Sequence, residues 1–578
     1  MKGATAWRTI ISRAVLIIHH SAFIIALTAG VCAAQGDTPP PRPDPRFGVV
    51  EAFVNADAAR EAGAGFTRII LRWDVIQPGG PADWKPANVP DPFVARELAD
   101  GRQVVGLLIG TPAWASADGV ADARAVPRMD AWAAFTRRMA QHYRGRIHQW
   151  IIWNEPDVWD AGHPGSTWLG SEADYARLLK TAYLAIKGVD PSAQVALAGQ
   201  TYYWDWTHGR RRYLDRLLEL LAADPDAPAN GFFFDILPYH LYFNPTQPPL
   251  VIGEARAALA RHGIGGKEIW INETNAPPSD DGQELPWSAP RYRISLAEQA
   301  AFVIQQFSQA FAAGASRVAI YKLRNTADHP ESIEPFGLLR GDDSRRPAFA
   351  AFRAATTYLG GFRGVTRQQM GEVVAVTFDR GGQTTTVLWT WGRAAARVRV
   401  RAIAPSAVLV DELGRPAPIA ATGGSYVIDL PGAVCSAGPD CSIGGAPRLL
   451  VETGVPVAAA GGRVALIPPP TGTPSQTPTA TPAPATATPT LTATALASPV
   501  PTPTPTAAPP ATLTPSPSPT PPPTVAPPTV LPPAASATPP VAAETAVTAH
   551  DWRPAAGAGA LVALMLIAWA ARRGRVRR

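Results

Sequence analysis

Short apolar runs rich in β-branched residues alternate with longer amphipathic segments from residue 46 to residue 360. The runs are typical of strands buried on both faces, and the longer segments repeat their apolar residues every three or four positions, as helices do. We therefore predict strands at 47–50, 66–71, 103–109, 147–153, 194–198, 233–237, 268–272 and 317–321. The predicted helices cover 55–62, 92–99, 130–143, 171–187, 211–222, 251–262, 295–313 and 347–358.

Eight consecutive strand and helix units predict an α/β fold, a closed (β/α)8 TIM barrel over residues 46–360. All strands of such a barrel run parallel, and its functional residues lie on the loops that follow the strands. Candidate chemistry is therefore expected at the carboxyl ends of the predicted strands.

After residue 364 the pattern changes to strands separated by glycine, proline and aspartate turns. Arginine and valine alternate strictly from Arg397 to Arg401, which predicts a strand with one wet face and one buried face. The predicted strands are 373–378, 384–389, 397–402, 407–410, 426–430 and 449–452. We predict a small C-terminal β-sandwich over residues 364–454.

The composition changes again in the last part of the chain. The chain has 62 prolines, and many of them crowd residues 467–549, where they alternate with threonine, serine and alanine almost without charge, so a disordered linker is expected. Residues 554–571 are nearly uncharged and long enough to cross a bilayer as a transmembrane helix. Residues 572–578 hold five arginines, as expected of a basic cytoplasmic tail, so the membrane is a predicted partner.

The N-terminus has the pattern of an export signal. A basic start, an apolar run and small residues predict a signal peptide at 1–34, although the apolar run is long enough to leave a retained N-terminal anchor as an alternative. The protein is then exported and held at the cell surface by its C-terminal helix. In that compartment Cys435 and Cys441 could form a disulfide that persists.

The formal net charge of +6 comes from the two ends of the chain, and the part between them is slightly acidic. This excludes the basic surface that a nucleic-acid partner requires. The sequence also contains no phosphate-binding glycine loop, nucleotide fingerprint or metal-ligand cluster, so no cofactor is predicted.

Two glutamates follow predicted strands in a way that indicates catalysis. Glu155 lies in Trp153-Asn154-Glu155-Pro156 after the fourth strand, and Glu273 follows the seventh. Glycoside hydrolysis needs two carboxyl groups, because one protonates the departing oxygen while the other attacks or stabilises the sugar carbon. The pair predicts an enzyme that binds and cleaves a carbohydrate.

Other motifs follow other predicted strands: Arg72-Trp73 after the second, Thr111-Pro112-Ala113-Trp114 after the third and Tyr239-His240-Leu241-Tyr242 after the sixth. With the two glutamates, these motifs resemble the clan of retaining glycoside hydrolases built on (β/α)8 barrels (clan A). Family 39 is the most similar and family 5 the next. The resemblance covers residues 46–454 in domain order.

The resemblance implies that Glu155 is the general acid/base and Glu273 the nucleophile of a retaining glycosidase. Apolar neighbours such as Trp153 favour a protonated acid, and a cation such as Arg72 favours an ionised nucleophile. A retaining mechanism places the two carboxyl groups about 5 Å apart, and an inverting one roughly 6.5–9.5 Å. The expected substrate-binding residues are Arg72, Trp114, Asn154, His240, Tyr242 and Tyr321.

Within this set, Asn154 is expected to hydrogen-bond the sugar 2-hydroxyl, and His240 and Tyr242 to hold the nucleophile in place. Tyr321 stands where many clan members have a tryptophan that forms the floor of the sugar site. Lys322 or Arg324 would meet an acidic sugar, or would simply be solvated loop cations.

Two other functions fit the same barrel. A non-catalytic carbohydrate-binding surface protein would keep the cleft without the chemistry, and a transglycosylase would pass the sugar to another hydroxyl group. The intact pair of carboxylates favours hydrolysis over the first of these.

Overall fold

The computed structural model describes residues 43–283, 293–325, 335–436, 442–454 and 462–468. Eight strands form a closed barrel in the order of the sequence, and β1 closes the ring by pairing with β8. Every neighbouring pair in the barrel is parallel, which confirms the predicted barrel. The strands are β1 (Phe47–Val49), β2 (Phe66–Arg72), β3 (Gln103–Ile109), β4 (Gln149–Ile152), β5 (Gln194–Ala196), β6 (Ile236–His240), β7 (Glu268–Thr274) and β8 (Arg317–Ile320).

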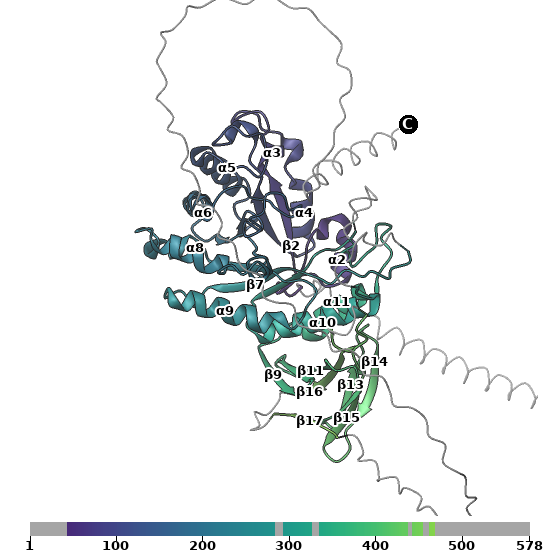
Figure 1. The fold of residues 1–578 in the computed structure, drawn as a ribbon. Coiled ribbons are helices and arrows are strands. Elements are labelled where there is room, and N and C mark those ends of the chain that lie inside the picture. Colours follow the sequence, from purple (N-terminus) through teal and green to yellow (C-terminus); the bar gives the residue numbers. More distant parts are fainter. Residues whose placement is uncertain (1–42, 284–292, 326–334, 437–441, 455–461, 469–578) are drawn as a thin grey trace, which may run out of the picture. The chain divides into compact units, whose positions relative to one another are not determined.

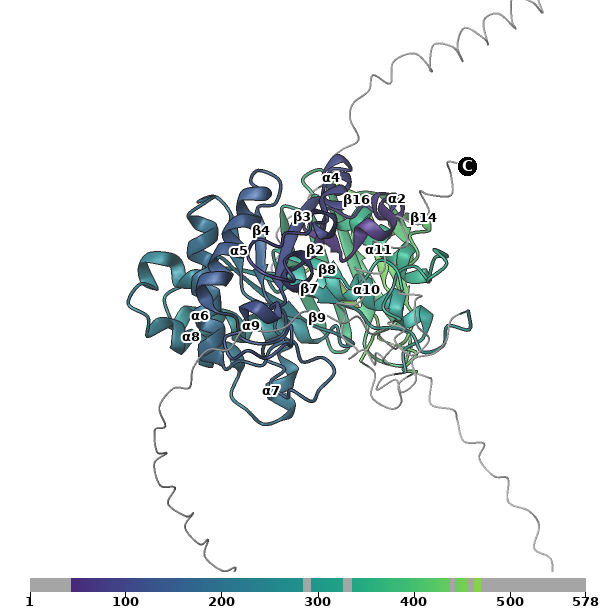
Figure 2. The ribbon, with the colours of Figure 1, turned by 90° about the horizontal axis from the view of Figure 1, so that it is seen from above.

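Helices surround the barrel strands, with α5, α6, α8 and α9 along one side and α10 and α11 along the other (Figures 1 and 2). The α-helices are α2 (Ala56–Glu61), α3 (Trp73–Ile76), α4 (Asp91–Ala99), α5 (Met129–His142), α6 (Glu172–Lys187), α7 (Tyr203–Thr207), α8 (Tyr213–Ala222), α9 (Gln247–Arg261), α10 (Leu296–Ala312) and α11 (Pro347–Leu359). The short 3-10 helices are η1 (Ala52–Asn55), η2 (Pro86–Asn88), η3 (Ala113–Ala115) and η4 (Pro228–Phe233). Helix α6 begins at a capping box, in which Ser171 and Asp174 exchange side-chain and backbone hydrogen bonds.

The interior of the barrel is a packed core. It consists of one buried side chain or more from each strand or its end, with Phe66 and Trp270 as the largest members. Their rings lie 6.0 Å apart between centroids. Because side chains fill this space, the reactive groups lie at the carboxyl ends of the strands.

The sixth strand lies three residues later than the sequence pattern suggested. We predicted 233–237, but the strand is Ile236–His240, because Phe232 and Phe233 belong to η4 and both have φ of 59°. That left-handed backbone cannot continue a strand. The shift makes His240 the last residue of the strand itself.

Two antiparallel sheets follow the barrel. The strand order is β14-β13-β16-β11-β10-β9 in one and β15-β12-β17 in the other. Residues of both sheets form one hydrophobic cluster. Leu388 and Leu450 belong to it from the first sheet, and Val400 and Tyr426 from the second. The strands are β9 (Gly364–Met370), β10 (Val373–Asp379), β11 (Gln383–Thr390), β12 (Ala396–Arg401), β13 (Ser406–Val410), β14 (Pro416–Ala420), β15 (Ser425–Leu430), β16 (Arg448–Thr453) and β17 (Val464–Leu466). Strand β17 lies beyond residue 454, where the sandwich was predicted to end.

Helix α10 packs against both the barrel and these sheets, and it is buried along almost its whole length. The amide of Gln305 donates to the carbonyl oxygens of Gly444 and Gly445 at 3.0 Å each and accepts from the Gly444 N–H at 3.0 Å. Arg367 of β9 donates to Gln309 at 2.7 Å. The side chains of Gln305 and Gln309 are therefore buried with partners, which removes the desolvation cost of leaving these two amides unpaired.

Several predictions concern residues outside the described part of the chain. These are the signal peptide at 1–34, the transmembrane helix at 554–571, the basic tail at 572–578 and nearly all of the linker at 467–549. Within the described ranges no helix combines the length and the apolar character needed to cross a bilayer. Cys435 is disulfide-bonded, and Cys441 lies outside the described residues.

Candidate active site

Glu273 lies on β7 at a β-bulge. Tyr239 of β6 is opposite Ile271, but the next residue, His240, is opposite Glu273, so β7 contains one extra residue at this point. The pairing of β7 with β8 shows the same shift. Strict alternation from Trp270, which faces the barrel interior, would place Glu273 on the outer face. The bulge therefore brings the carboxylate to the inner side.

Charged and polar groups surround the Glu273 carboxylate, whose side chain is only 8% exposed. Arg68 of β2 forms an ion pair with Oε1, and the Tyr242 hydroxyl donates to Oε2 at 2.5 Å. Burial alone would raise the pKa of Glu273, but the charges of Arg68 and His240 and the Tyr242 hydrogen bond hold this pKa below its ordinary value. Glu273 is therefore ionised near neutral pH.

Glu155 occupies the loop after β4, where the backbone turns sharply. Trp153 has φ of 72° and Glu155 has φ of 40°. The turn lets both Ile152 and Trp153 pack in the cluster between strands and helices, while the Trp153 indole donates to the Thr167 carbonyl at 2.8 Å. The N–H of Glu155 donates to the Gly199 carbonyl at 3.0 Å. Left-handed backbone at non-glycine residues is costly and is concentrated at functional sites.

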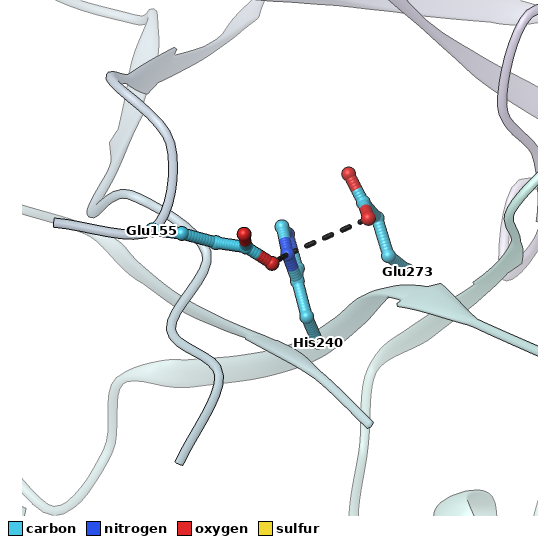
Figure 3. A group of neighbouring side chains, drawn as sticks. All are labelled: Glu155, His240 and Glu273. Atoms are coloured by element: carbon cyan, nitrogen blue, oxygen red, sulfur yellow. Dashed lines mark hydrogen bonds and ion pairs between the residues drawn. The ribbon is translucent and has the colours of Figure 1, made fainter. Parts of the chain in front are cut away.

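His240 lies between the two carboxylates (Figure 3). Its Nδ1 is 2.6 Å from Glu155 Oε1 and 3.5 Å from Glu273 Oε2. Burial would lower the pKa of His240, but the neighbouring carboxylates Glu273 and Glu155 outweigh this effect and raise the pKa above its ordinary value. On the other side of the ring, a Cβ added to Gly199 would be 2.0 Å from Nε2. Gly199 thus leaves the space that the ring needs.

The two carboxyl groups are close together. One oxygen of Glu155, one oxygen of Glu273 and a ring nitrogen of His240 all lie within 4.8 Å of one another. This approach of the nearest oxygens is close to the separation of about 5 Å between the carboxyl groups of retaining enzymes, and below the roughly 6.5–9.5 Å of inverting ones. The geometry matches direct attack by one carboxylate.

The same three side chains offer the donor atoms that a metal ion requires. However, the Glu273 oxygens already receive a guanidinium group and a phenol hydroxyl, and Nδ1 of His240 is directed at Glu155. The positive charge that a carboxylate pair needs is thus provided by Arg68. The set fits proton transfer and nucleophilic attack better than it fits a metal.

The cation beside the candidate nucleophile is Arg68 and not Arg72. Arg72 instead binds Asp74, with Nε donating to Oδ1 at 2.8 Å. The expectation that Arg72 keeps Glu273 ionised is therefore wrong. Arg68 and Arg72 lie four residues apart on β2 and share a face of the strand, so the sequence pattern placed the cation on the correct strand but at the wrong residue.

Aromatic rings lie beside Glu273. The rings of Tyr242 and Tyr321 are 6.3 Å apart between centroids, and Phe336 lies 5.4 Å from Tyr242 and 5.7 Å from Tyr321. Burial and the charge of Glu273 raise the pKa of Tyr242 well above its ordinary value, so its hydroxyl keeps the proton that it donates. The peptide bond between Tyr321 and Lys322 is cis.

Trp114 and Asn154 lie on the loops after β3 and β4, as expected. The Trp114 indole donates to the Gln77 carbonyl at 2.7 Å and its ring contacts Trp73 edge-on. Asn154 is half-buried, and its backbone pairs with Gly199. The backbone of Asn154 is thus fixed beside the loop that supports His240.

Lys322 and Arg324 have acidic partners within the protein. Lys322 Nζ is 3.6 Å from Glu51 Oε2, and the Lys322 side chain is 2% exposed. Arg324 binds Asp343 at 3.2 Å. Lys322 is therefore not a solvated loop cation, whereas Arg324 is partly exposed and forms its ion pair at the surface.

The sequence analysis missed Arg68, Gly199 and Asp157. Asp157 is 2% exposed and accepts the Thr201 N–H at 2.8 Å and the Thr201 hydroxyl at 2.7 Å. A signal for Arg68 was present, because a charged residue within an apolar strand requires a buried partner. Gly199 and Asp157 follow from the packing of two loops, which no local pattern reveals.

Solved structures with a similar fold include glycoside hydrolases. A family 39 glycoside hydrolase from the gut symbiont Bacteroides cellulosilyticus WH2 matches with a TM-score of 0.53 and 20% identity, over 71% of this chain and 81% of that chain. A GH39 β-xylosidase from Caulobacter crescentus has a TM-score of 0.48 and 15% identity, over 71% and 96%. A GH30 endoxylanase from Clostridium papyrosolvens C71 has a TM-score of 0.48 and 15% identity, over 71% and 97%.

The first of these likenesses gives the class of fold. The first likeness shows that this chain shares the eight-stranded parallel barrel of a family 39 glycoside hydrolase, so the predicted resemblance is confirmed for the fold. No protein-family model matches the chain, and neither does any curated protein.

Proposed function

We propose that this protein is a retaining glycoside hydrolase that cleaves an O-glycosidic bond of an oligosaccharide or polysaccharide. Glu155 serves as the general acid/base and Glu273 as the nucleophile. The observation that carries the proposal is the approach of the two carboxylates within 4.8 Å, with an ionised Glu273 held by Arg68 and Tyr242. The shared fold with a family 39 glycoside hydrolase supports it.

The first chemical step uses both groups at once. A Glu273 oxygen attacks the anomeric carbon, the bond from this carbon to the leaving oxygen breaks, and the leaving oxygen takes the proton of Glu155. Arg68 and Tyr242 keep the nucleophile ionised and fixed. The product of the step is a glycosyl ester on Glu273.

The second step hydrolyses this ester. Glu155, now a carboxylate, accepts a proton from a water molecule whose oxygen attacks the anomeric carbon, and Glu273 leaves as the free carboxylate. His240 contacts both glutamates and orients Glu155 through its Nδ1. In the free enzyme its raised pKa favours a positive charge on the ring beside the two glutamates.

Five further residues complete the proposed sugar site. Asn154 is assigned to the sugar 2-hydroxyl, because it immediately precedes Glu155. Trp114 and Tyr321 offer aromatic surface to the sugar ring, Arg72 offers donors to its hydroxyl groups, and the Tyr242 oxygen can accept a hydrogen bond from one of them.

We also propose that the enzyme is exported and tethered to the membrane. The support is the sequence alone: an N-terminal signal pattern, a proline-rich segment and an apolar stretch followed by five arginines. Fractionation of cells that express the full chain, or a chain ending at residue 549, tests this. The full chain is expected in the membrane fraction and the shortened chain in the medium.

The function is tested with a panel of aryl β-glycosides and the variants Glu155→Gln and Glu273→Gln. Glu273→Gln is expected to lower kcat by at least about 10³-fold on every active substrate, because the nucleophile is lost. Glu155→Gln is expected to slow substrates with poor leaving groups by about 10²–10⁴-fold. Substrates with a nitrophenol leaving group should lose less in the first step, since nitrophenolate departs without a proton.

The alternatives give other results. A carbohydrate-binding protein without catalysis would show no turnover in the wild type or in either variant. A transglycosylase would form products longer than the substrate, in amounts that rise with the concentration of acceptor sugar. Equal losses in both variants on all leaving groups would contradict the assigned roles.

A further inference from the structure

A group of aromatic side chains lies on the two loops that follow β4 and β5. The Trp159 ring is 6.2 Å from Trp204 and 5.3 Å from His208 between centroids. Trp204 is 8% exposed and lies under the group, whereas Trp159 is 43% exposed. His163 also contacts Trp204, at 4.5 Å. Trp159 is therefore a large apolar ring that rests on other rings and faces solvent.

A row of charged side chains packs against Trp159. The Arg210 guanidinium lies 4.7 Å above the Trp159 ring centroid. Arg210 in turn lies 3.7 Å from the buried carboxylate of Asp205, which also receives Arg216 at 3.1 Å. One face of the Trp159 indole is thus covered by a fixed cation, so the ring is preorganised before any ligand binds.

The loop that carries Trp159 is the loop that carries the proposed acid. The Val158 N–H donates to the Glu155 carbonyl at 3.1 Å, and Asp157 binds the N–H and hydroxyl of Thr201 on the neighbouring loop. These bonds fix the short segment between Glu155 and Trp159. The general acid must contact the oxygen that joins the cleaved sugar to its leaving group, so this loop borders the leaving-group side of the site.

We propose that Trp159 is a stacking platform for the sugar unit on the leaving-group side of the scissile bond. The proposal rests on the function proposed above and adds that the substrate is an oligosaccharide or polysaccharide, bound by more than the sugar that reacts. Pyranose rings expose an apolar C–H face, and a rigid, exposed indole is the matching surface. Trp206, which is 62% exposed on α7, is a candidate for the next unit along the same chain.

The test compares two substrates of the same sugar in the full-length protein. One is a glycosyl fluoride, whose leaving group is too small to reach Trp159, and the other is an unmodified oligosaccharide. Trp159→Ala is expected to lower kcat/KM for the oligosaccharide about tenfold, because one stacking contact is lost. The same variant should change kcat/KM for the glycosyl fluoride by less than about twofold. Trp159→Phe keeps a ring and should retain most of the oligosaccharide activity.

Leu184→Ala is the matched control, because Leu184 is 44% exposed on α6 and lies outside the aromatic group. This variant should leave kcat/KM unchanged for both substrates. Equal losses on both substrates in Trp159→Ala would show a structural role and overturn the platform, and so would no loss on either. A wild type that hydrolyses neither substrate would overturn the proposed function, and the platform with it.

Discussion

The two candidate catalytic carboxyl groups have different surroundings, although both contact His240. Glu273 belongs to a continuous strand, its side chain is 8% exposed, and it receives Arg68 and Tyr242. Glu155 belongs to a loop and is 18% exposed. The chain thus surrounds one carboxylate with donors and leaves the other closer to solvent.

This difference supports the proposed division of labour between two chemically identical groups. A nucleophile must remain an anion, which a buried cation and a phenol hydroxyl promote. An acid/base must exchange its proton with substrate and water, which a more exposed position allows.

Loss of the Arg68 charge should have the largest effect. Arg68→Met removes the cation that lowers the pKa of Glu273, so a larger fraction of Glu273 would be protonated at neutral pH. We expect kcat to fall by about 10²–10³-fold. The acid limb of the kcat/KM profile should move to higher pH, because this limb follows the ionisation of the nucleophile.

Arg68→Lys serves as the conservative variant, since it keeps the charge and should restore part of the activity. Circular dichroism and the melting temperature report whether each variant is folded. An acid limb that stays in place in a folded Arg68→Met protein would contradict the role of Arg68.

A methyl group at position 199 should disturb the histidine between the carboxylates. In Gly199→Ala the new Cβ would meet His240 Nε2 at 2.0 Å, so the ring or the loop must move. We expect kcat to fall about 10–100-fold and stability to fall by about 1–3 kcal/mol. Gly266→Ala adds the same methyl group where no heavy atom lies within 4 Å, and should leave kcat unchanged. Equal kcat values in the two variants would show that the position of the ring is not critical.

Asp157 should make the stability of the native protein depend on pH. Burial raises its pKa from 3.8 to about 7; Thr201 hydrogen bonds oppose this increase, and the charge of Glu155 adds to it. The native state therefore retains a proton that the unfolded chain releases between about pH 4 and pH 7. The contribution of Asp157 to the free energy of unfolding is therefore greatest below about pH 4. It decreases by up to about 4 kcal/mol as the pH rises through 7.

Asp157→Asn keeps an acceptor for the Thr201 N–H but cannot ionise, so this part of the pH dependence should disappear. Urea unfolding of both proteins between pH 4 and pH 8 measures the difference. If both proteins show the same slope of stability against pH, Asp157 does not titrate as described.

The smallest effect is expected at Arg72. Because Arg72 binds Asp74 and not Glu273, Arg72→Met should leave the acid limb of the pH profile in place. A severalfold increase in KM is the expected result of losing one contact to a sugar hydroxyl. Steady-state kinetics at several pH values measure both quantities. A shifted acid limb would mean that Arg72 also controls the ionisation of Glu273.

The sequence predicted those features that depend on periodicity. Eight alternating strands and helices led to the barrel, and the positions of Glu155 after β4 and of Glu273 at the carboxyl end of β7 placed the two carboxylates at one end of it. Alternation also indicated the antiparallel strands, such as β12 with its exposed arginines. These features are local in sequence and follow from burial of apolar side chains.

Features that break the periodicity were not predictable in this way. The bulge in β7 directs Glu273 inward against the simple alternation, and positive φ at Trp153 and Glu155 redirects the loop after β4. The choice of Arg68 over Arg72 depends on which guanidinium reaches Glu273 in three dimensions. Such contacts arise from tertiary packing between distant strands, which a single sequence does not specify locally.

The most direct test of the central claim is to trap the covalent intermediate. A 2-deoxy-2-fluoro glycoside of an active substrate, with a good leaving group, slows the second step more than the first, so the glycosyl ester accumulates. Mass spectrometry of the digested protein should find the added sugar on the peptide that contains Glu273, and no adduct in Glu273→Gln. A label on Glu155, or a first product of inverted anomeric configuration, would contradict the account.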